Sequence, residues 1–476
     1  MQYVLGNMLN GGGGLNPDGL SLDLQFAADK TLTARRGPTP SFSRASSGTF
    51  VNANGLIVGK TAGTTSSITP STQAIGSQVT VTVASGSVVG WVVGQAISLI
   101  VDTDGQDDPD ATELWLLGNI VSTTGTTLVF EVTSRTAQAG SATSWTLGYR
   151  GPRFDHTSAG VCRGLLIEEG RTNICLQSEN FGTTWTTSQL NTTGTPAYIN
   201  VATAPNGATT ADKLIATTTN TTHQFRQDVT LVTGTSYTIS VYFKAAETNF
   251  ATIAVVGAAN GNVDWVSYFN ISASSPATGQ FNGFANTSLV DVGNGWRRCS
   301  VTFTATASGT LNVRLGGAGS TTSGSDFYVG DGTSGFFLWG AQLEAGSFAT
   351  SYIPTGAGSV VRSADVCSIT GANFTSFYNS IEGTSYTAFS RIANSGDQRT
   401  LTYTNGTSGN RLEVLRISSV NRENIAIYSS GSFAFEINLG TNIAAGSIVK
   451  IANTMKSNDW AASINGAAAV TIFDMD

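Results

Sequence analysis

The feature that most constrains this chain is a two-residue alternation of apolar and polar side chains in many short runs. The clearest are Gln78–Val83 (QVTVTV), Tyr237–Phe243 (YTISVYF) and Cys299–Ala305 (CSVTFTA). No stretch of helix length shows a period of about 3.6 residues. Alternation of this kind buries one face of a strand and leaves the other in water, as in an antiparallel sandwich. The sequence therefore predicts an all-β fold of several antiparallel β-sandwich or jelly-roll modules.

Length and composition fit several small domains. A chain of 476 residues is too long for one domain, and about three are expected. Hydrophobic residues make up 40% of the chain, enough for real cores, whereas charged residues make up only 12%. Solubility must therefore come from Thr, Ser, Asn and Gly, which suit turns and the solvent faces of strands better than helices.

Charge and apolar runs exclude several classes of protein. The net charge is −7, and no basic cluster exceeds the pairs Arg35–Arg36 and Arg297–Arg298, so nucleic-acid binding is not expected. No apolar run is long enough to span a membrane, and the first residues lack the pattern of a secretory signal. The four cysteines form no C-x-x-C pair, which favours free thiols in a reducing compartment; a Cys162–Cys175 bridge is the alternative.

Two longer motifs point to a family. One is Arg163–Asn173 (RGLLIEEGRTN), followed by Ser178–Trp185 (SENFGTTW), and the other is Trp339–Thr355 (WGAQLEAGSFATSYIPT). Between them lie the alternating segments SYTISVYFKA and GNGWRRCSVTFTA. This layout resembles the carbohydrate-binding-type jelly roll of bacteriophage virion proteins, such as tail fibres, head fibres and capsid decorations.

The resemblance implies a structural protein of the virion that is assembled in the host cytoplasm. Its modules would adhere to host-surface glycans, and its partners would be other virion proteins of the capsid, the portal or collar, or the tail. Fibres of this kind imply a homo-oligomer, with a trimer favoured. The alternative is a decoration or collar protein that stabilises neighbouring virion subunits without binding a glycan.

The order of the motifs predicts five segments along the chain. Residues 1–15 form an exposed arm, because the glycine run within them cannot hold a fixed path unaided. Residues 16–60 and 150–176 resemble one virion-attachment unit that an insertion splits. The other segments are the inserted small β-barrel-like module (61–149), a jelly roll (177–358) and a sandwich that resembles concanavalin A or laminin G domains (359–476).

The insertion and the last segment carry their own signals. Five β-type runs without a helical period indicate a small antiparallel barrel or sandwich in the insertion: Gln78–Val83, Ala96–Val101, Asn119–Val121, Thr127–Val132 and Ser144–Leu147. In the last segment, Asn465-Gly466 is a strong hairpin signal. That segment is shorter than such sandwiches usually are, so either a neighbouring subunit completes the sheet or the chain is a fragment.

Residues suited to catalysis are scarce. His156 and His223 have no partner at metal-ligand spacing, and no G-x-S-x-G nucleophile motif occurs. Glu168 and Glu169 are adjacent, so in a strand they face opposite ways and cannot flank one glycosidic bond. One of them is expected to pair with Arg171. We therefore expect no enzyme, and in particular no capsule-degrading tailspike.

The sharpest acidic cluster is the run DTDGQDDPD. Four of its side chains offer oxygen ligands at the short spacing that suits calcium: Asp102, Asp104, Asp107 and Asp108. The run lacks the glycine that an EF-hand needs at its sixth position, and Pro109 interrupts it. A solvated hairpin loop is therefore favoured, with a structural calcium as the alternative and no other cofactor expected.

Two positions argue against a second calcium site. In the jelly rolls that this chain resembles, ligands come from an acidic residue after an N-x-x-F-type turn and from an acidic residue in the final strand. Gly182 and Gln342 stand at these positions here.

Aromatic residues are the candidates for sugar contact, because the apolar faces of neutral sugars stack on aromatic rings. Four lie in turn-like settings rich in Asn, Gly and Thr: Trp185, Trp265, Tyr268 and Trp296. The alternative for each is core or inter-subunit packing. Trp339, within the apolar run FFLWG, is expected in a core.

Overall fold

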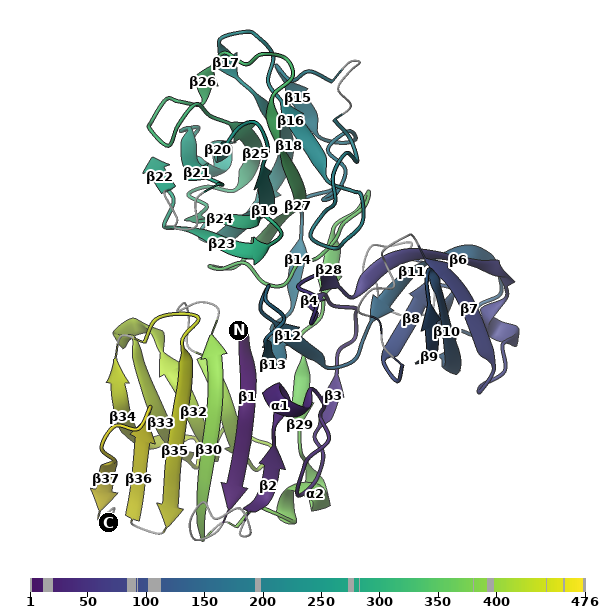
Figure 1. Ribbon diagram of the computed structural model, residues 1–476. Helices are drawn as coiled ribbons and strands as arrows, with labels where there is room; N and C mark the ends of the chain where they lie inside the picture. The colour runs from purple at the N-terminus through teal and green to yellow at the C-terminus, as the bar shows by residue number, and fades with distance from the viewer. Residues whose placement is uncertain are drawn as a thin grey trace.

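The structure, a computed structural model, contains three β-rich units that meet at a joint of short strands (Figure 1). It describes residues 2–11, 20–83, 91, 93–101, 113–192, 198–272, 278–281, 283–379, 381–391, 398–441, 443–456 and 459–473. About 54% of the chain is strand and 4% is helix, and the sheets are antiparallel, so the predicted all-β fold is confirmed. No helix of these described ranges is long and apolar enough to cross a bilayer.

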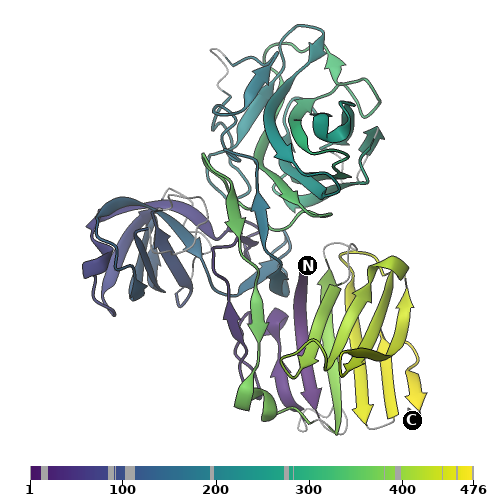
Figure 2. The ribbon, with the colours of Figure 1, turned by 180° about the vertical axis from the view of Figure 1, so that it is seen from behind.

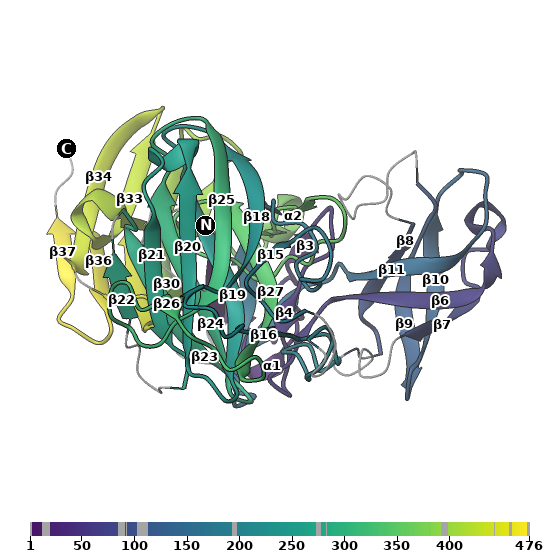
Figure 3. The same cartoon turned by 90° about the horizontal axis from the view of Figure 1, so that it is seen from above.

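The inserted module is a closed six-stranded barrel that stands to one side of the other units (Figure 3). Its strands follow the order β10-β7-β6-β11-β8-β9. They are β6 (Lys60–Ile68), β7 (Gln78–Val83), β8 (Ala96–Ile100), β9 (Trp115–Thr124), β10 (Thr127–Arg135) and β11 (Ala142–Tyr149), with a 3-10 turn η2 (Pro70–Thr72). Strand β6 was not predicted, because KTAGTTSSI has no large apolar side chain before its last residue. The barrel-like fold expected for the insertion is confirmed.

The jelly roll packs a six-stranded sheet against a five-stranded sheet. The first sheet is β15 (Thr186–Ser188), β18 (Gln224–Leu231), β25 (Gly309–Gly317), β20 (Phe250–Gly257), β21 (Trp265–Asn270) and β22 (Thr278–Phe281). The second is β16 (Asp212–Ile215), β27 (Gly335–Ala345), β19 (Ser236–Ala245), β24 (Trp296–Thr304) and β23 (Asn286–Gly293). Short elements β17 (Thr221–Thr222), β26 (Phe327–Tyr328) and η3 (Ala258–Asn260) lie at its ends. Fully buried Phe243, Ile253 and Val301 fill the space between the sheets.

The C-terminal sandwich has one large and one small sheet. The large sheet is β12 (Arg153–His156), β13 (Cys162–Glu168), β1 (Gln2–Gly11), β30 (Glu382–Arg391), β35 (Ile448–Lys456), β36 (Asp459–Ile464) and β37 (Val470–Phe473), with β2 (Leu20–Leu24) paired to β1. The small sheet is β31 (Gln398–Thr404), β32 (Arg411–Ile417), β33 (Arg422–Ser429) and β34 (Ser432–Thr441). Short helices α1 (Phe26–Asp29), α2 (Gly371–Thr375) and η4 (Ser418–Val420) flank the strands. The β36–β37 hairpin turns at Asn465-Gly466, both with positive φ, as predicted.

The chain itself completes this sandwich. Residues 2–11 are not the exposed arm that the glycine run suggested; they form β1, which pairs with β13, β2 and β30 (Figures 1 and 2). Likewise, β2, β12 and β13 belong to the large sheet and not to a separate attachment unit. Segments from the start and middle of the chain therefore supply the strands that residues 359–476 lack.

Three short antiparallel pairs form the joint between the units. They are β3 (Ser41–Ser43) with β29 (Val366–Ser368), β4 (Phe50–Val51) with β5 (Ile57–Val58), and β14 (Arg171–Asn173) with β28 (Val360–Arg362). Each pair has two or three residues a strand, too few to hold the units by backbone bonds alone. Side-chain contacts must therefore fix the joint.

Deleting residues 2–11 tests the role of β1. We expect the jelly roll to stay folded and the C-terminal sandwich to lose protection, because β13 and β30 would lose their shared neighbour. Hydrogen exchange measured by mass spectrometry separates the two units. Unchanged protection of β30 and β13 after the deletion would show that the segment is an arm after all.

Candidate functional site

The joint is built around two buried carboxylates and three buried arginines. Arg153 donates from Nη1 to Glu168 Oε2 over 2.6 Å and pairs through Nη2 with Asp365. Arg44 Nη1 lies 2.8 Å from the other Asp365 oxygen, and Arg362 Nη1 lies 3.4 Å from Glu168 Oε2. All five side chains are at most 1% exposed. Because a buried charge is tolerated only when it is paired, these groups must come together as a set.

Backbone and hydroxyl groups lock this set in place. Glu168 N donates to Asp365 Oδ2, and Asp365 N donates to Glu168 O, both over 2.8 Å. Ser351 N donates to Glu168 Oε1 over 2.8 Å. Asn173 Nδ2 donates to Ile353 O, also over 2.8 Å. The two motifs that carry the family resemblance are therefore direct partners of one another across the joint.

The ionisation of the joint follows from this packing. Burial opposes the charge on Glu168, but Arg362, Arg153 and Ser351 outweigh it and lower the pKa of this carboxyl to about 2. Burial likewise opposes the charge on Arg153, yet Asp365 and Glu168 raise its pKa above the ordinary value. The pair of Glu168 with Arg153 therefore stays charged at neutral pH.

The adjacent residues Glu168 and Glu169 offer a matched test of the joint. Glu168→Ala should cost about 3–5 kcal/mol of unfolding free energy, because it leaves buried arginines without their partner. Glu169 pairs with Arg171, as expected for one of the two glutamates, but its side chain is 40% exposed. Glu169→Ala should therefore cost less than about 1 kcal/mol. Urea unfolding measures both, and equal losses would contradict a special role for the buried carboxylate.

The four aromatic residues expected to contact sugars lie in the protein interior. Trp185, Trp265, Tyr268 and Trp296 are 5%, 8%, 2% and 1% exposed. Their polar atoms are also used inside the chain: Trp296 Nε1 donates to Thr203 O over 3.2 Å, and Tyr268 Oη donates to Asp326 Oδ1 over 2.5 Å. None of the four presents a ring face to solvent, so this expectation is corrected. Trp339 is fully buried, as expected.

The expected calcium site falls in a part of the chain that the structure does not describe. Asp102, Asp104, Asp107 and Asp108 lie outside the described residues. Within the described residues, no group of three or more His, Cys, Asp or Glu side chains is placed to hold a metal ion. Both histidines contact backbone carbonyls: His156 Nδ1 lies 3.0 Å from Val51 O, and His223 Nδ1 lies 2.6 Å from Gln189 O.

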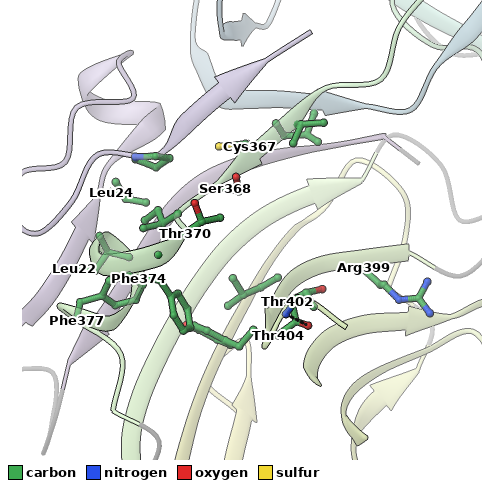
Figure 4. Close-up of a pocket in the computed structure, with 18 of the residues that line it drawn as sticks. Leu22, Leu24, Cys367, Ser368, Thr370, Phe374, Phe377, Arg399, Thr402 and Thr404 are labelled. Atoms are coloured by element: carbon green, nitrogen blue, oxygen red, sulfur yellow. Dashed lines mark hydrogen bonds between the residues drawn. The ribbon is translucent and has the colours of Figure 1, made fainter. Parts of the chain in front are cut away.

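The C-terminal sandwich holds a cavity of about 1040 Å³, here called the slot (Figure 4). It lies between strand β31 and the segment formed by β29 and α2. Its floor is apolar, with Leu22, Leu24, Phe26 and Ile167 from the large sheet and the adjoining helix α1. The slot is therefore a gap between the two sheets where the small sheet ends.

A second cavity of about 660 Å³ adjoins the slot and shares Phe374, Tyr403, Thr404 and Asn405 with it. We call it the aromatic cleft. It is also lined by half-buried aromatic rings and by amide and cationic groups: Tyr378, Tyr428, Trp460, Asn410, Arg411 and Lys456. The Arg411 guanidinium lies 3.6 Å from the centre of the Tyr428 ring and 2.9 Å from Glu413. Exposed ring faces beside amides are the groups that bind sugars.

Sequence reasoning missed the aromatic cleft. Its rings come from the loop before β30, from β33 and from β36, which are distant in sequence. No local pattern joins these residues, since only the pairing of the strands brings them together. Only a prediction of how the strands of the sandwich pair could have identified these residues as one site.

Comparison with known proteins adds little detail. No protein-family profile matches the sequence, and no curated protein matches it. A solved structure similar to the chain is the N-terminal CBM22-1–CBM22-2 tandem domain of Xyn10C from Paenibacillus barcinonensis. The identity is 11% and the TM-score 0.23, over 65% of this chain and 100% of that chain. A likeness of this degree is distant and assigns neither a family nor a ligand.

Glu179, which lies beside the joint, makes stability depend on pH. Burial raises the pKa of its carboxyl to about 7 from 4.5, although a hydrogen bond from Tyr352 works the other way. The folded chain therefore keeps a proton that the unfolded chain releases between these pH values, and stability falls as pH rises through this window. Glu179→Gln should reduce the fall between pH 4.5 and 8 by about 1–3 kcal/mol, measured by urea unfolding. Identical pH slopes for both proteins would contradict this assignment.

Proposed function

We propose that the chain is a non-enzymatic structural protein of a bacteriophage virion, as a tail fibre, head fibre or decoration, that holds its β modules against host-surface glycans. One observation carries the proposal: the two motifs that resemble virion appendage proteins contact each other at the joint. Glu168 with Ser351, and Asn173 with Ile353, tie those motifs together. In this proposal the two motifs serve to fix the arrangement of the modules.

A fixed joint suits adhesion. Buried ion pairs hold their partners in one arrangement, so surfaces on different modules keep a constant separation. Weak sites held at constant separation on an oligomer bind with an avidity far above that of each site. A homotrimer attached to capsid, collar or tail proteins would provide such an array.

The aromatic cleft is the proposed glycan site. Tyr378, Tyr428 and Trp460 are half-buried rings of the cleft. Arg411 covers one face of Tyr428, and Phe374 and Tyr403 stack on Tyr378, so the remaining exposed parts of the three rings are the proposed contacts for the apolar face of a sugar. Asn405 and Asn410 supply amide donors and acceptors for hydroxyl groups at the rim. This site replaces the interior residues that the sequence suggested.

A purely structural decoration protein is the second candidate, and the same joint favours it. Such a protein would lock neighbouring virion subunits and would bind no glycan. Binding measurements on the aromatic cleft distinguish the two candidates.

Trp460→Ala and Tyr428→Ala should each weaken binding to a host lipopolysaccharide or capsule preparation by about 2- to 12-fold, because an aromatic contact is worth about 0.5–1.5 kcal/mol. Tyr386→Ala is the control, since Tyr386 lies on β30 of the same sandwich but outside the cleft. Surface plasmon resonance gives the affinities, and immunogold electron microscopy of phage particles tests the virion location. Absence of glycan binding by the intact protein, with labelled particles, would favour the decoration protein; unlabelled particles would overturn both candidates.

A further inference from the structure

The two sheets of the C-terminal sandwich differ in width. The large sheet runs through β12, β13, β1 and β30 to β37, whereas the small sheet has only four strands and begins at β31. Strands β2 and β13 of the large sheet therefore have inner faces that no strand of the small sheet covers. Leu22, Leu24 and Ile167 on these faces form the floor of the slot. The width of the slot is thus a consequence of unequal sheets.

Strand edges form both walls of the slot. One wall consists of the consecutive residues Arg399–Gly406, and a run of consecutive residues lines a cavity only when the strand turns its edge toward it. Among the described strands, β31 pairs only with β32, on the side away from the slot. The opposite wall includes Val366–Ser368, which is β29, and β29 pairs only with β3 within the described chain. Figure 4 shows Ser368 above Thr402, with Leu24 and Phe374 to the left of both.

The unpaired strand edges distinguish between two possible ligands of the slot, a lipid chain and an extended peptide. A lipid chain would match the apolar floor, but it would bury backbone N–H and C=O groups of β31 and β29 without partners, at about 1–3 kcal/mol for each group. An extended peptide matches both features, since its backbone satisfies the two edges and alternate side chains can contact the accessible apolar lining, which includes Val366, Ile369 and Phe374. The edge groups therefore favour a peptide strand over a lipid.

The charged residues that line the slot restrict which peptides can bind there. The two charged residues of the slot lining are already paired: Asp365 with Arg44 and Arg153, and Arg399 with Glu413. A charged side chain entering the slot would find no free counter-ion and would lose its hydration. The complementary segment is uncharged, with alternating apolar residues.

We propose that the slot binds an extended, uncharged segment of another protein, which adds a fifth strand to the small sheet next to β31 and bridges to β29. A second copy is a poorer donor, because each described strand of this chain is already paired within its own fold. This site is additional to the proposed glycan site: it is a binding site for a partner polypeptide beside the joint.

The test uses the full chain and a synthetic eight-residue peptide of alternating threonine and valine, with blocked ends. Hydrogen exchange read by mass spectrometry should show at least tenfold slower exchange in residues 399–404 and 366–368 when the peptide is present. A peptide with N-methyl groups on alternate residues keeps the apolar face but blocks one of its two edges, so it should lose the protection of at least one of the two strands. A peptide with aspartate in place of valine should also fail.

Two variants provide the controls. Ser368→Trp places a large ring in the slot and should abolish the protection. Ser432→Trp lies on β34, at the edge of the small sheet opposite to β31, and should leave the protection unchanged. Equal protection by the N-methylated peptide, absence of binding by the alternating peptide, or protection lost equally in both variants would overturn the proposal. Binding of palmitate instead of the peptide would also overturn it. So would a dimer, detected by light scattering, in which the slot is protected from exchange without any peptide.

Discussion

The arrangement of this protein depends on one buried guanidinium. Arg153 lies between Glu168 and Asp365, and Arg44 and Arg362 complete the pairing. Its partners come from β13 and from the segment after β28, so the charges are satisfied only when distant parts of the chain have folded together. A buried pair of this kind adds little net stability over apolar packing, but breaking it is costly. It therefore selects one geometry of the modules and penalises every other.

Part of this architecture could be predicted from the sequence. Alternation identified β7, β19 and β24 because large β-branched or aromatic residues recur at alternate positions, although β19 is buried on both faces. It failed for β6, where threonine, serine and glycine leave no contrast between faces. It also failed for β1, because the glycine run after it suggested an arm, and only pairing with β13 and β30 shows a strand.

The candidate site was harder to predict for a physical reason. Trp265 and Trp296 each begin a strand, β21 and β24, and the first residue of a strand points to one face of its sheet. The polar residues next to these two tryptophans indicated a nearby turn. They could not indicate whether each ring would point to the core or to the solvent face of its sheet. The rings of the aromatic cleft, in contrast, come together only through the pairing of β35 with β36 and of β32 with β33. Such long-range contacts have no local sequence signal.

The slot and the joint share a residue, and this couples them. Asp365 accepts hydrogen bonds from Arg44 and from Glu168 N, and the next residue begins β29, one wall of the slot. A strand bound between β29 and β31 would hold β29 in place and so favour the state in which Asp365 is seated among the arginines. Any ligand that binds only this state stabilises it by RT ln(1 + [L]/Kd), where [L] is the free ligand concentration. The partner that fills the slot would therefore also stiffen the joint. Binding of a neighbouring protein at the slot and the fixed arrangement of the modules would then be thermodynamically linked.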